Sequence, residues 1–393
     1  MVPKAFLQGI LLAASFGSLF VSAAPSLSLS LSGAKYVNAV GDLKVTATLT
    51  NTGDETVKVL HDPHGALSDM PADTFSIANE DGSVPNFAGI MVKYVPKVAA
   101  EEHEYTVLHP GQSVDVEHDL SSAYDFSSSG EGVYSIHANT HFYIVDPSSP
   151  EGVSSVYADS TPHIAQISGI EQQQFDFGSD TEQNVFNATA IADDFEDLED
   201  EVALEGVDLA DDEEADLAED DDDVKTNASF RRCSSRQRRL IRKAAVSAQR
   251  YVRSAYNYAR SRHGSRNRRY KLWFGRWSPR RYVKVLRAFK RMNQNRYSGY
   301  TYDCSCRRSG TYAYVHPDNY GTVYLCGAFW RAPLVGKNSK AGTIVHESSH
   351  FTRNAGTIDR AYGHDKCKAL ALRNPNVAVR NADSYEYYTE NTA

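Results

Sequence analysis

Apolar and polar residues alternate with a period of two in the first half of the chain. The clearest segments are residues 27–31, 43–49, 105–108, 114–116 and 133–138. Turn-forming clusters at 51–54 and 109–112 separate them. Frequent short alternating segments are typical of antiparallel strands, so we expect residues 24–175 to form an all-β sandwich of the immunoglobulin-like kind.

The second half has the longer period of amphipathic helices. One apolar stripe of period 3.6 comprises Leu240, Ala244, Ala248, Tyr251, Ala255 and Tyr258. Ser278 and Pro279 predict the start of a second helix, with Val283, Leu286 and Phe289 facing inward. We expect a final helix to carry Ala369, Leu370 and Leu372.

Two short segments between these helices, residues 312–315 and 322–325, predict a small hairpin-type sheet. We expect the second to be the edge on which a peptide could pair. The sequence thus predicts a multi-domain protein in which residues 225–393 form a mainly α (α+β) domain with a small sheet.

The N-terminus has the pattern of a secretory signal peptide. Lys4 precedes an apolar run over residues 5–21, and Val21-Ser22-Ala23 offers small residues for cleavage. We therefore expect residues 1–23 to be removed and the protein to be secreted. No other stretch is long and apolar enough for a bilayer, so we expect no membrane association.

Charge divides the chain into two halves of opposite sign. Residues 225–393 hold 35 Lys and Arg against 8 Asp and Glu (+27), whereas residues 1–224 hold 6 against 42 (−36). Much of the negative charge lies in residues 176–224, which we expect to be a flexible linker, since like charges repel and stay solvated. Our hypothesis is that this linker lies against the basic domain before maturation.

The densest candidate chemistry lies in Gly342–Gly363. His346-Glu347-Ser348-Ser349-His350 has the H-E-x-x-H pattern. On a helix, His346 and His350 share one face and could hold one metal ion, while Glu347 lies beside them as a candidate general base. The third His of a metzincin would fall at Gly356, whereas a thermolysin-like enzyme would use a later glutamate, such as Glu386 or Glu390.

Downstream of the motif, the chain reads Gly356-Thr357-Ile358-Asp359-Arg360-Ala361-Tyr362-Gly363. With H-E-x-x-H before it, this segment resembles the deuterolysin family of zinc endopeptidases, the aspzincins. The resemblance implies a zincin-type domain with His346, His350 and Asp359 as ligands of one Zn²⁺. It also implies Glu347 as general base and Tyr362 as the phenol that stabilises the oxyanion.

One branch of that family, the peptidyl-Lys metalloendopeptidases, is more similar still. The shared segments are residues 321–330 and Asn381-Ala382-Asp383-Ser384-Tyr385-Glu386-Tyr387. The resemblance implies that Asp383 and Glu386 line the pocket for the residue after the scissile bond. Two carboxylates three residues apart on a helical turn face the same way and suit a lysine ammonium.

The resemblance also implies that residues 24–224 are a propeptide, so that the domain's own propeptide is its partner before maturation. Lys225 is the only lysine between Lys97 and Lys243. An enzyme that cuts before lysine could therefore release itself at Val224–Lys225, and cleavage near Arg231-Arg232 by another protease is the alternative. The histidines of the first half have no metal-binding spacing, so we expect loop or strand-face positions for them: His61, His64, His103, His109, His118, His137, His141 and His163.

All five cysteines lie in residues 225–393, and an exported protein can form disulfides. By resemblance, Cys233 pairs with Cys304 and Cys306 with Cys326. Cys367 is then unpaired, either buried or available for dimerisation.

The sequence therefore predicts a secreted zinc endopeptidase, made as a zymogen, that cleaves proteins and peptides on the amino side of lysine. A broad-specificity deuterolysin-like protease is one alternative. The other is a secreted protein that binds polyanions or nucleic acid through the basic residues 231–308, with Tyr270, Trp273, Trp277 and Tyr282 interleaved. For the enzyme, we expect only non-specific attraction to nucleic acid.

Overall fold

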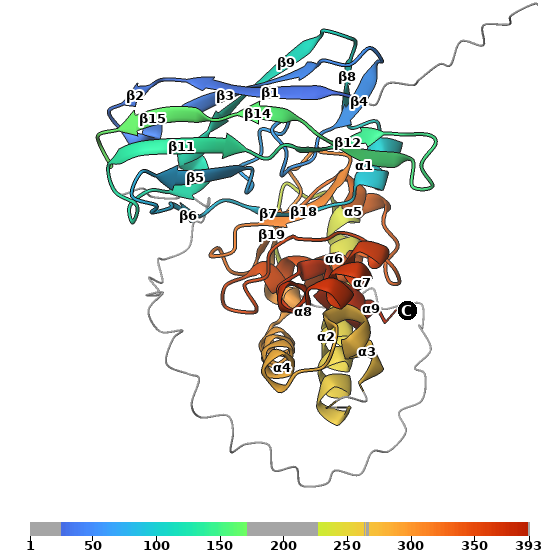
Figure 1. The fold of residues 1–393 in the computed structure, drawn as a ribbon. Helices are drawn as coiled ribbons and strands as arrows, with labels where there is room; N and C mark the ends of the chain where they lie inside the picture. The colour runs from blue at the N-terminus through green and yellow to red at the C-terminus, as the bar shows by residue number, and fades with distance from the viewer. Residues whose placement is uncertain (1–24, 171–226, 263, 265–266, 392–393) are drawn as a thin grey trace, which may run out of the picture.

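The structure is a computed structural model that describes residues 25–170, 227–262, 264 and 267–391. The expected signal peptide, the acidic linker 176–224 and the Val224–Lys225 bond lie outside the described residues. Figure 1 shows two parts, which we call the β-domain (residues 25–170) and the helical domain (described residues from 227 onward). The β-domain lies over one end of the helical domain.

Short strands dominate the β-domain, as the alternation predicts. They are β1 (Leu27–Gly33), β2 (Tyr36–Val37), β3 (Lys44–Asn51), β4 (Val57–Leu60), β5 (Phe75–Asn79), β6 (Asn86–Phe87), β7 (Met91–Tyr94), β8 (Tyr105–Leu108), β9 (Ser113–Asp119), β10 (Tyr124–Asp125), β11 (Gly132–Ala138), β12 (His141–Val145), β13 (Val153–Tyr157), β14 (Asp159–Thr161) and β15 (His163–Ile167). One short helix, α1 (Pro96–Glu101), follows β7.

Three four-stranded sheets contain most of these strands, while β6 pairs with β10 and β7 joins a sheet of the helical domain. Their orders are β14-β1-β3-β9, β2-β15-β11-β5 and β13-β12-β4-β8. In β1 and β3, alternate residues such as Leu29, Leu49 and Val45 are buried, because successive side chains on a strand point to opposite faces. The all-β character matches the expectation, whereas the immunoglobulin likeness stays a prediction.

The helical domain contains nearly all of the α-helix. Its elements are β16 (Ser229–Arg231), α2 (Ser235–Ser261), α3 (Arg268–Phe274), α4 (Pro279–Gln294), β17 (Thr301–Asp303), β18 (Thr311–Val315), β19 (Thr322–Leu325), α5 (Gly327–Arg331), α6 (Lys340–His350), α7 (His364–Arg373), α8 (Pro375–Ala378) and α9 (Ala382–Glu390). Helices α2 and α6 share one apolar core with α4 and α9.

Both predicted helices are present, but the face that α4 turns toward the core differs in part from the prediction. On α2, Ala244, Ala248 and Ala255 are buried as expected. On α4, however, Tyr282 and Val285 face the core, while Val283 is 38% exposed. The phase follows the large aromatic ring, since Tyr282 packs on Tyr270 and Trp277.

The predicted helix that carries Ala369, Leu370 and Leu372 is present as α7, but it is not the final helix, because α8 and α9 follow it. Cys367 and Ala371 are the buried residues of α7, while Leu372 is 82% exposed. Helix α7 lies against α3 and α8. Cys367 is a buried free thiol, which disfavours the dimerisation alternative.

The expectation that residues 322–325 form the edge of the small sheet is wrong. Its order is β16-β17-β19-β18-β7, so β19 lies inside the sheet between β17 and β18. Among the strands of the helical domain itself, β18 therefore lies at one edge of the sheet. Strand β7 of the β-domain pairs with this edge. Figure 1 shows β7 beside β18 where the two domains meet.

Two disulfides, Cys233–Cys304 and Cys306–Cys326, fasten the sheet to its surroundings. These are the pairs that the family resemblance implies. Within the described ranges, no helix has the length and apolar character needed to cross a bilayer.

Candidate metal centre

Helix α6 carries the central motif. Ser339 caps its N-terminus by accepting a hydrogen bond from the Gly342 amide at 2.9 Å, and all residues of the helix are buried. The rings of His346 and His350 lie on one face, with centroids 4.9 Å apart. Gly342 permits α9 to approach α6, because a Cβ there would lie 2.1 Å from Oε1 of Glu390.

Asp359 reaches the two histidines from the loop after α6. Its carboxylate oxygens lie 3.3 Å from Nε2 of His346 and 3.3 Å from Nε2 of His350. The loop is fastened to the start of α9, where the Asn381 side chain accepts hydrogen bonds from the amides of Arg360 and Ala361, both at 2.9 Å. Asn381 belongs to the segment 381–387 that carries the family resemblance, but its hydrogen bonds to the loop of Asp359 could not be inferred from residue spacing.

This arrangement fits a metal ion. His346, His350 and Asp359 can each offer a ligand atom within 4.8 Å of the others. Within the described part of the chain, the Nε2 atoms of both histidines and both Asp359 oxygens are buried without a hydrogen-bond partner. Buried polar groups are normally satisfied, so these atoms point to a cation. Two imidazoles and one carboxylate are a donor set that Zn²⁺ accepts.

The tautomer of His350 also fits this role. Its Nδ1 atom donates to the Thr357 carbonyl oxygen at 2.9 Å, which leaves Nε2 unprotonated toward Asp359. Burial lowers the pKa of His346, but the charge of Asp359 and the contacts with Asp383 and Glu386 outweigh it, so the pKa is raised. The alternative third ligands fit less well, because the other candidate group (His346, Asp383 and Glu386) does not include His350.

Glu347 has the surroundings of a proton-transfer group. Its side chain is fully buried, and neither carboxylate oxygen has a hydrogen-bond partner within the described ranges. Burial raises the pKa of Glu347 to about 7, although the nearby charges of His346 and His350 lower it. A carboxyl that titrates near neutral pH can both take and return a proton.

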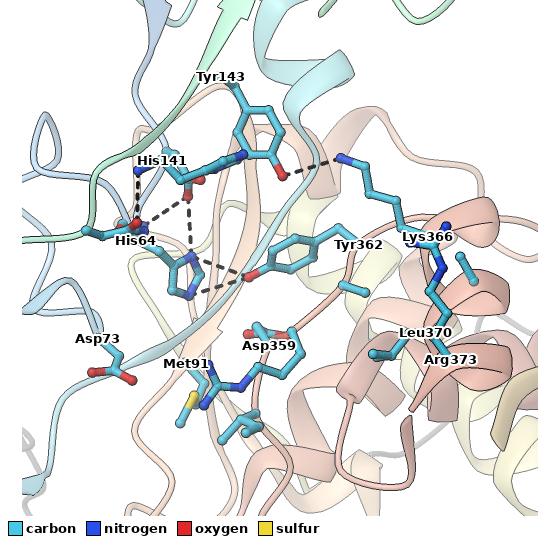
Figure 2. Close-up of a pocket in the computed structure, with 16 residues that line it drawn as sticks. His64, Asp73, Met91, His141, Tyr143, Asp359, Tyr362, Lys366, Leu370 and Arg373 are labelled. Carbon is cyan, nitrogen blue, oxygen red and sulfur yellow. Dashed lines mark hydrogen bonds and ion pairs between the residues drawn. The ribbon is translucent and has the colours of Figure 1, made fainter. Parts of the chain in front are cut away.

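Tyr362 lies at the border between the two domains. Its hydroxyl donates to the Val92 carbonyl oxygen at 3.1 Å and lies 3.4 Å from the His64 ring nitrogens. Figure 2 shows the His64 ring facing the Tyr362 hydroxyl, with Asp359 and Met91 nearby. These residues line an interdomain cavity of about 460 Å³. His64 was expected only as a loop or strand-face residue, and nothing in its spacing indicated this contact.

Asp383 and Glu386 lie together on α9, as expected, and both side chains are fully buried. Asp383 lies 2.9 Å and Glu386 3.2 Å from Nδ1 of His346, so both carboxylates also contact a candidate metal ligand. The other oxygen of Asp383, Oδ2, accepts a hydrogen bond from the Gly363 amide at 2.8 Å.

Lys93 of β7 fills the space beside these carboxylates. Its ammonium forms a fully buried ion pair with Glu386 and lies 5.0 Å from the centre of the Tyr312 ring. Burial lowers the pKa of Lys93, but the charges of Glu386, Asp383 and Glu390 outweigh it, and the pKa is raised. Nothing in the sequence marks this residue, because a lysine in a predicted β-sandwich has no signal of its own.

The site groups two histidines of one helix with a carboxylate from the following loop, and a buried glutamate lies beside them. These features define a metal-dependent hydrolase of the zincin class. Comparison with known proteins specifies the family. Residues 259–390 match the aspzincin family model, described as lysine-specific metallo-endopeptidase.

Relatives with this description extend over nearly the whole chain. The peptidyl-Lys metalloendopeptidase of Grifola frondosa is 43% identical over 374 residues, which cover 94% of each chain. That of Armillaria mellea is 41% identical over 94% of this chain and 93% of its own. An extracellular protease of Aeromonas hydrophila is 31% identical over 89% of this chain and 88% of its own.

The chain belongs to the aspzincin family of metalloendopeptidases and is most similar to its peptidyl-Lys branch. This membership favours the enzyme over the polyanion-binding alternative.

Proposed function

We propose that the chain is the precursor of a secreted zinc endopeptidase that cleaves peptide bonds on the amino side of lysine. The observation that carries the lysine preference is the buried ammonium of Lys93 against Glu386, with Asp383 beside it. An ammonium in a site shut off from water is stable only where carboxylates compensate its charge. A pocket that holds one lysine in this way suits the lysine of a substrate.

In the mechanism that we propose, His346, His350 and Asp359 hold Zn²⁺. When bound, the ion supplies Lewis-acid polarisation of the scissile carbonyl and lowers the pKa of a water molecule. Glu347 takes a proton from the attacking water and returns it to the leaving amine nitrogen, in keeping with its pKa near 7. Tyr362 donates a hydrogen bond to the carbonyl oxygen as negative charge develops there.

The remaining residues orient the reactants. Asp383 and Glu386 fix the imidazole of His346 through Nδ1, and the same carboxylates attract the substrate ammonium. The edge of β18 offers main-chain groups for pairing with an extended substrate, as it does with β7.

We also propose that residues 24–224 are the propeptide and that export precedes its removal. The signal-like N-terminus and the extracellular relative support export. Maturation by the enzyme itself at Val224–Lys225, where the acidic linker ends, follows from the lysine preference, because Lys225 is the only lysine between Lys97 and Lys243. Sequencing the N-terminus of the secreted form distinguishes it from cleavage near Arg231-Arg232.

The test is digestion of a denatured protein of mixed sequence by the mature enzyme, with and without a chelator. Mass spectrometry then identifies every new terminus. Products that begin with lysine and disappear with the chelator support the proposal. Chelator-sensitive cuts without a lysine preference would leave a broad-specificity protease, and no cleavage would refute the proposed activity.

A further inference from the structure

The β-domain contributes one strand to the sheet of the helical domain, and this strand lies across the candidate metal centre. Strand β7 pairs antiparallel with β18, with Lys93 opposite Ala313, Val92 opposite Tyr314 and Met91 opposite Val315. A peptide that adds to a sheet edge in this way is bound through its main chain, while pockets select its side chains.

Lys93 differs from every other basic residue of the β-domain. The described residues 25–170 contain four further lysines, Lys35, Lys44, Lys58 and Lys97, all exposed, and no arginine. Lys93 alone is fully buried, and its ammonium lies in the acidic pocket on α9. Burying an ammonium without a compensating charge costs free energy. The acidic pocket therefore determines that Lys93, and no other residue of β7, lies opposite it.

The carbonyl contact of Tyr362 fixes the same register independently. Its hydroxyl donates to the carbonyl oxygen of Val92, which belongs to the Val92–Lys93 peptide bond. In an enzyme that cuts before lysine, the lysine side chain fills the pocket and the oxyanion develops on the preceding carbonyl. One register of β7 satisfies both conditions, and a slip by one residue would move Lys93 to the opposite face of the strand.

Contacts on either side hold β7 in this position. Upstream, Ile90 and Val92 pack with Tyr314 in a small apolar cluster. Downstream, Val95 and Val98 pack against Tyr312, Ala328 and Ala332. Polar contacts surround them: Glu104 accepts from the Ser309 amide at 2.6 Å, Glu102 pairs with Arg331 at 2.8 Å, and Asp69 pairs with Arg308.

We propose that β7 is a built-in pseudosubstrate: Lys93 occupies the lysine pocket, the Val92–Lys93 bond lies in the scissile position, and the helical domain is thereby kept latent. This inference rests on the proposed lysine specificity and adds its regulation. The folded β-domain covers the site with Lys93 at the centre, and its acidic residues Asp69, Glu102 and Glu104 contact the helical domain around it. The hypothesis about the acidic linker 176–224 concerns residues outside the described ranges.

The test compares the intact chain, purified in chelator and reloaded with zinc, with the matured enzyme on a fluorogenic Xaa-Lys peptide. Initial rates are read while electrophoresis shows the chain to be uncut. Lys93→Met removes the ammonium at similar side-chain length, and Lys97→Met, at an exposed lysine of α1, is the matched control. We expect the wild type and Lys97→Met to be latent, at about 1% of the matured activity or less, and Lys93→Met to be at least about tenfold more active.

A Lys93→Met chain as latent as the wild type, beside a matured enzyme that is active, would overturn the inference. Equal activation by Lys97→Met would overturn it as well. If the matured enzyme itself does not cleave Xaa-Lys peptides, the proposed function fails instead, so the two failures are distinguishable.

A second measurement uses the wild type, in case Lys93→Met does not fold. The intact chain is acetylated under native conditions, and modification at Lys93 and Lys97 is followed by mass spectrometry beside activity. We expect Lys93 to react at least about tenfold more slowly than Lys97, with activity appearing in step with Lys93 modification. Rapid modification of Lys93 without a gain in activity would refute the inference.

Discussion

Asp383 lies 2.9 Å from Nδ1 of His346, so a residue expected to bind the substrate lysine also contacts a candidate metal ligand. The contact lowers the pKa of Asp383, although burial raises it. A carboxylate that accepts from the far nitrogen of a ligating imidazole fixes the ring and increases its basicity. Asp383 is therefore common to the candidate metal centre and the proposed lysine pocket.

Asp383→Asn should weaken metal binding as well as lysine recognition. We expect about 10- to 100-fold lower zinc affinity, because an amide supports the His346 imidazole less well than a carboxylate does. Competition with a zinc-binding dye measures this affinity. Asp365→Asn, an exposed position on α7, is the control. Unchanged affinity in Asp383→Asn would mean that the residue serves only the pocket.

Glu386→Gln should act chiefly on substrate choice. Glu386 forms the ion pair with the Lys93 ammonium, and its contact with His346 is longer than that of Asp383. We expect kcat/KM for Xaa-Lys peptides to fall at least about tenfold, since truncating one partner of a buried charge pair costs several kcal/mol. Peptides with an uncharged residue after the scissile bond should lose less. An equal loss on both peptide classes would argue against a specificity role.

Glu347→Gln should abolish turnover and leave metal binding intact. The amide cannot accept the proton of the attacking water, and general-base catalysis typically contributes about 10²- to 10⁴-fold. Metal content per chain and the rate on an Xaa-Lys peptide are measured on the same preparation. A zinc-loaded variant with wild-type activity would remove Glu347 from the mechanism.

Asp359→Ala should lose the metal as well as the activity. Asp359 is the sole carboxylate in the group that contains both motif histidines, within the residues that the structure describes. Without it, two imidazoles remain, which is fewer than the three protein ligands usual in catalytic zinc sites. Elemental analysis after dialysis measures the loss. Full zinc occupancy would indicate a different third ligand.

Much of this site could be predicted because its residues are close in sequence. His346, Glu347 and His350 lie on one helical stretch, where a four-residue spacing determines which side chains share a face. Asp359 and Tyr362 come next in a short loop, and the family resemblance implied their roles. The phase of α4 was less predictable, since tertiary packing of Tyr282 decided it over local apolar spacing.

Contacts between the domains could not be predicted from the sequence. Lys93 and Glu386 are 293 residues apart, and no local pattern indicates that a strand of one domain completes the sheet of another. The same holds for the edge at β18. The two strand patterns predicted the antiparallel pair of β18 and β19, which is present. Which of the two lies at the edge depends on β16 and β17, which add beside β19 through long-range contacts. The register of β7 on β18 is therefore determined by tertiary contacts rather than by local sequence.

Acid should weaken the contact between the domains through Glu104. Its carboxylate accepts hydrogen bonds from the Ser309 amide and hydroxyl, both at 2.6 Å, and contacts His61 within the β-domain. The interaction with His61, followed by the hydrogen bonds from Ser309, lowers the pKa of Glu104 to about 2 from an ordinary value of 4.5, although burial raises it. Because the folded pKa is depressed, this contribution to stability is present above about pH 4.5 and is lost as pH falls toward 2.

Glu104→Gln should therefore remove one pH-dependent component of stability. We expect the free energy of unfolding of the intact wild type to exceed that of the variant at pH 6, and the difference to shrink between pH 4.5 and 2. Denaturant unfolding at several pH values measures it, and Glu101→Gln, exposed on α1, is the control that should follow the wild type. The Ser309 component can be separated with Ser309→Ala, which removes one donor while leaving the His61 contact intact. If Glu104→Gln instead keeps a constant offset from the wild type over this range, the carboxylate is not the group that titrates there.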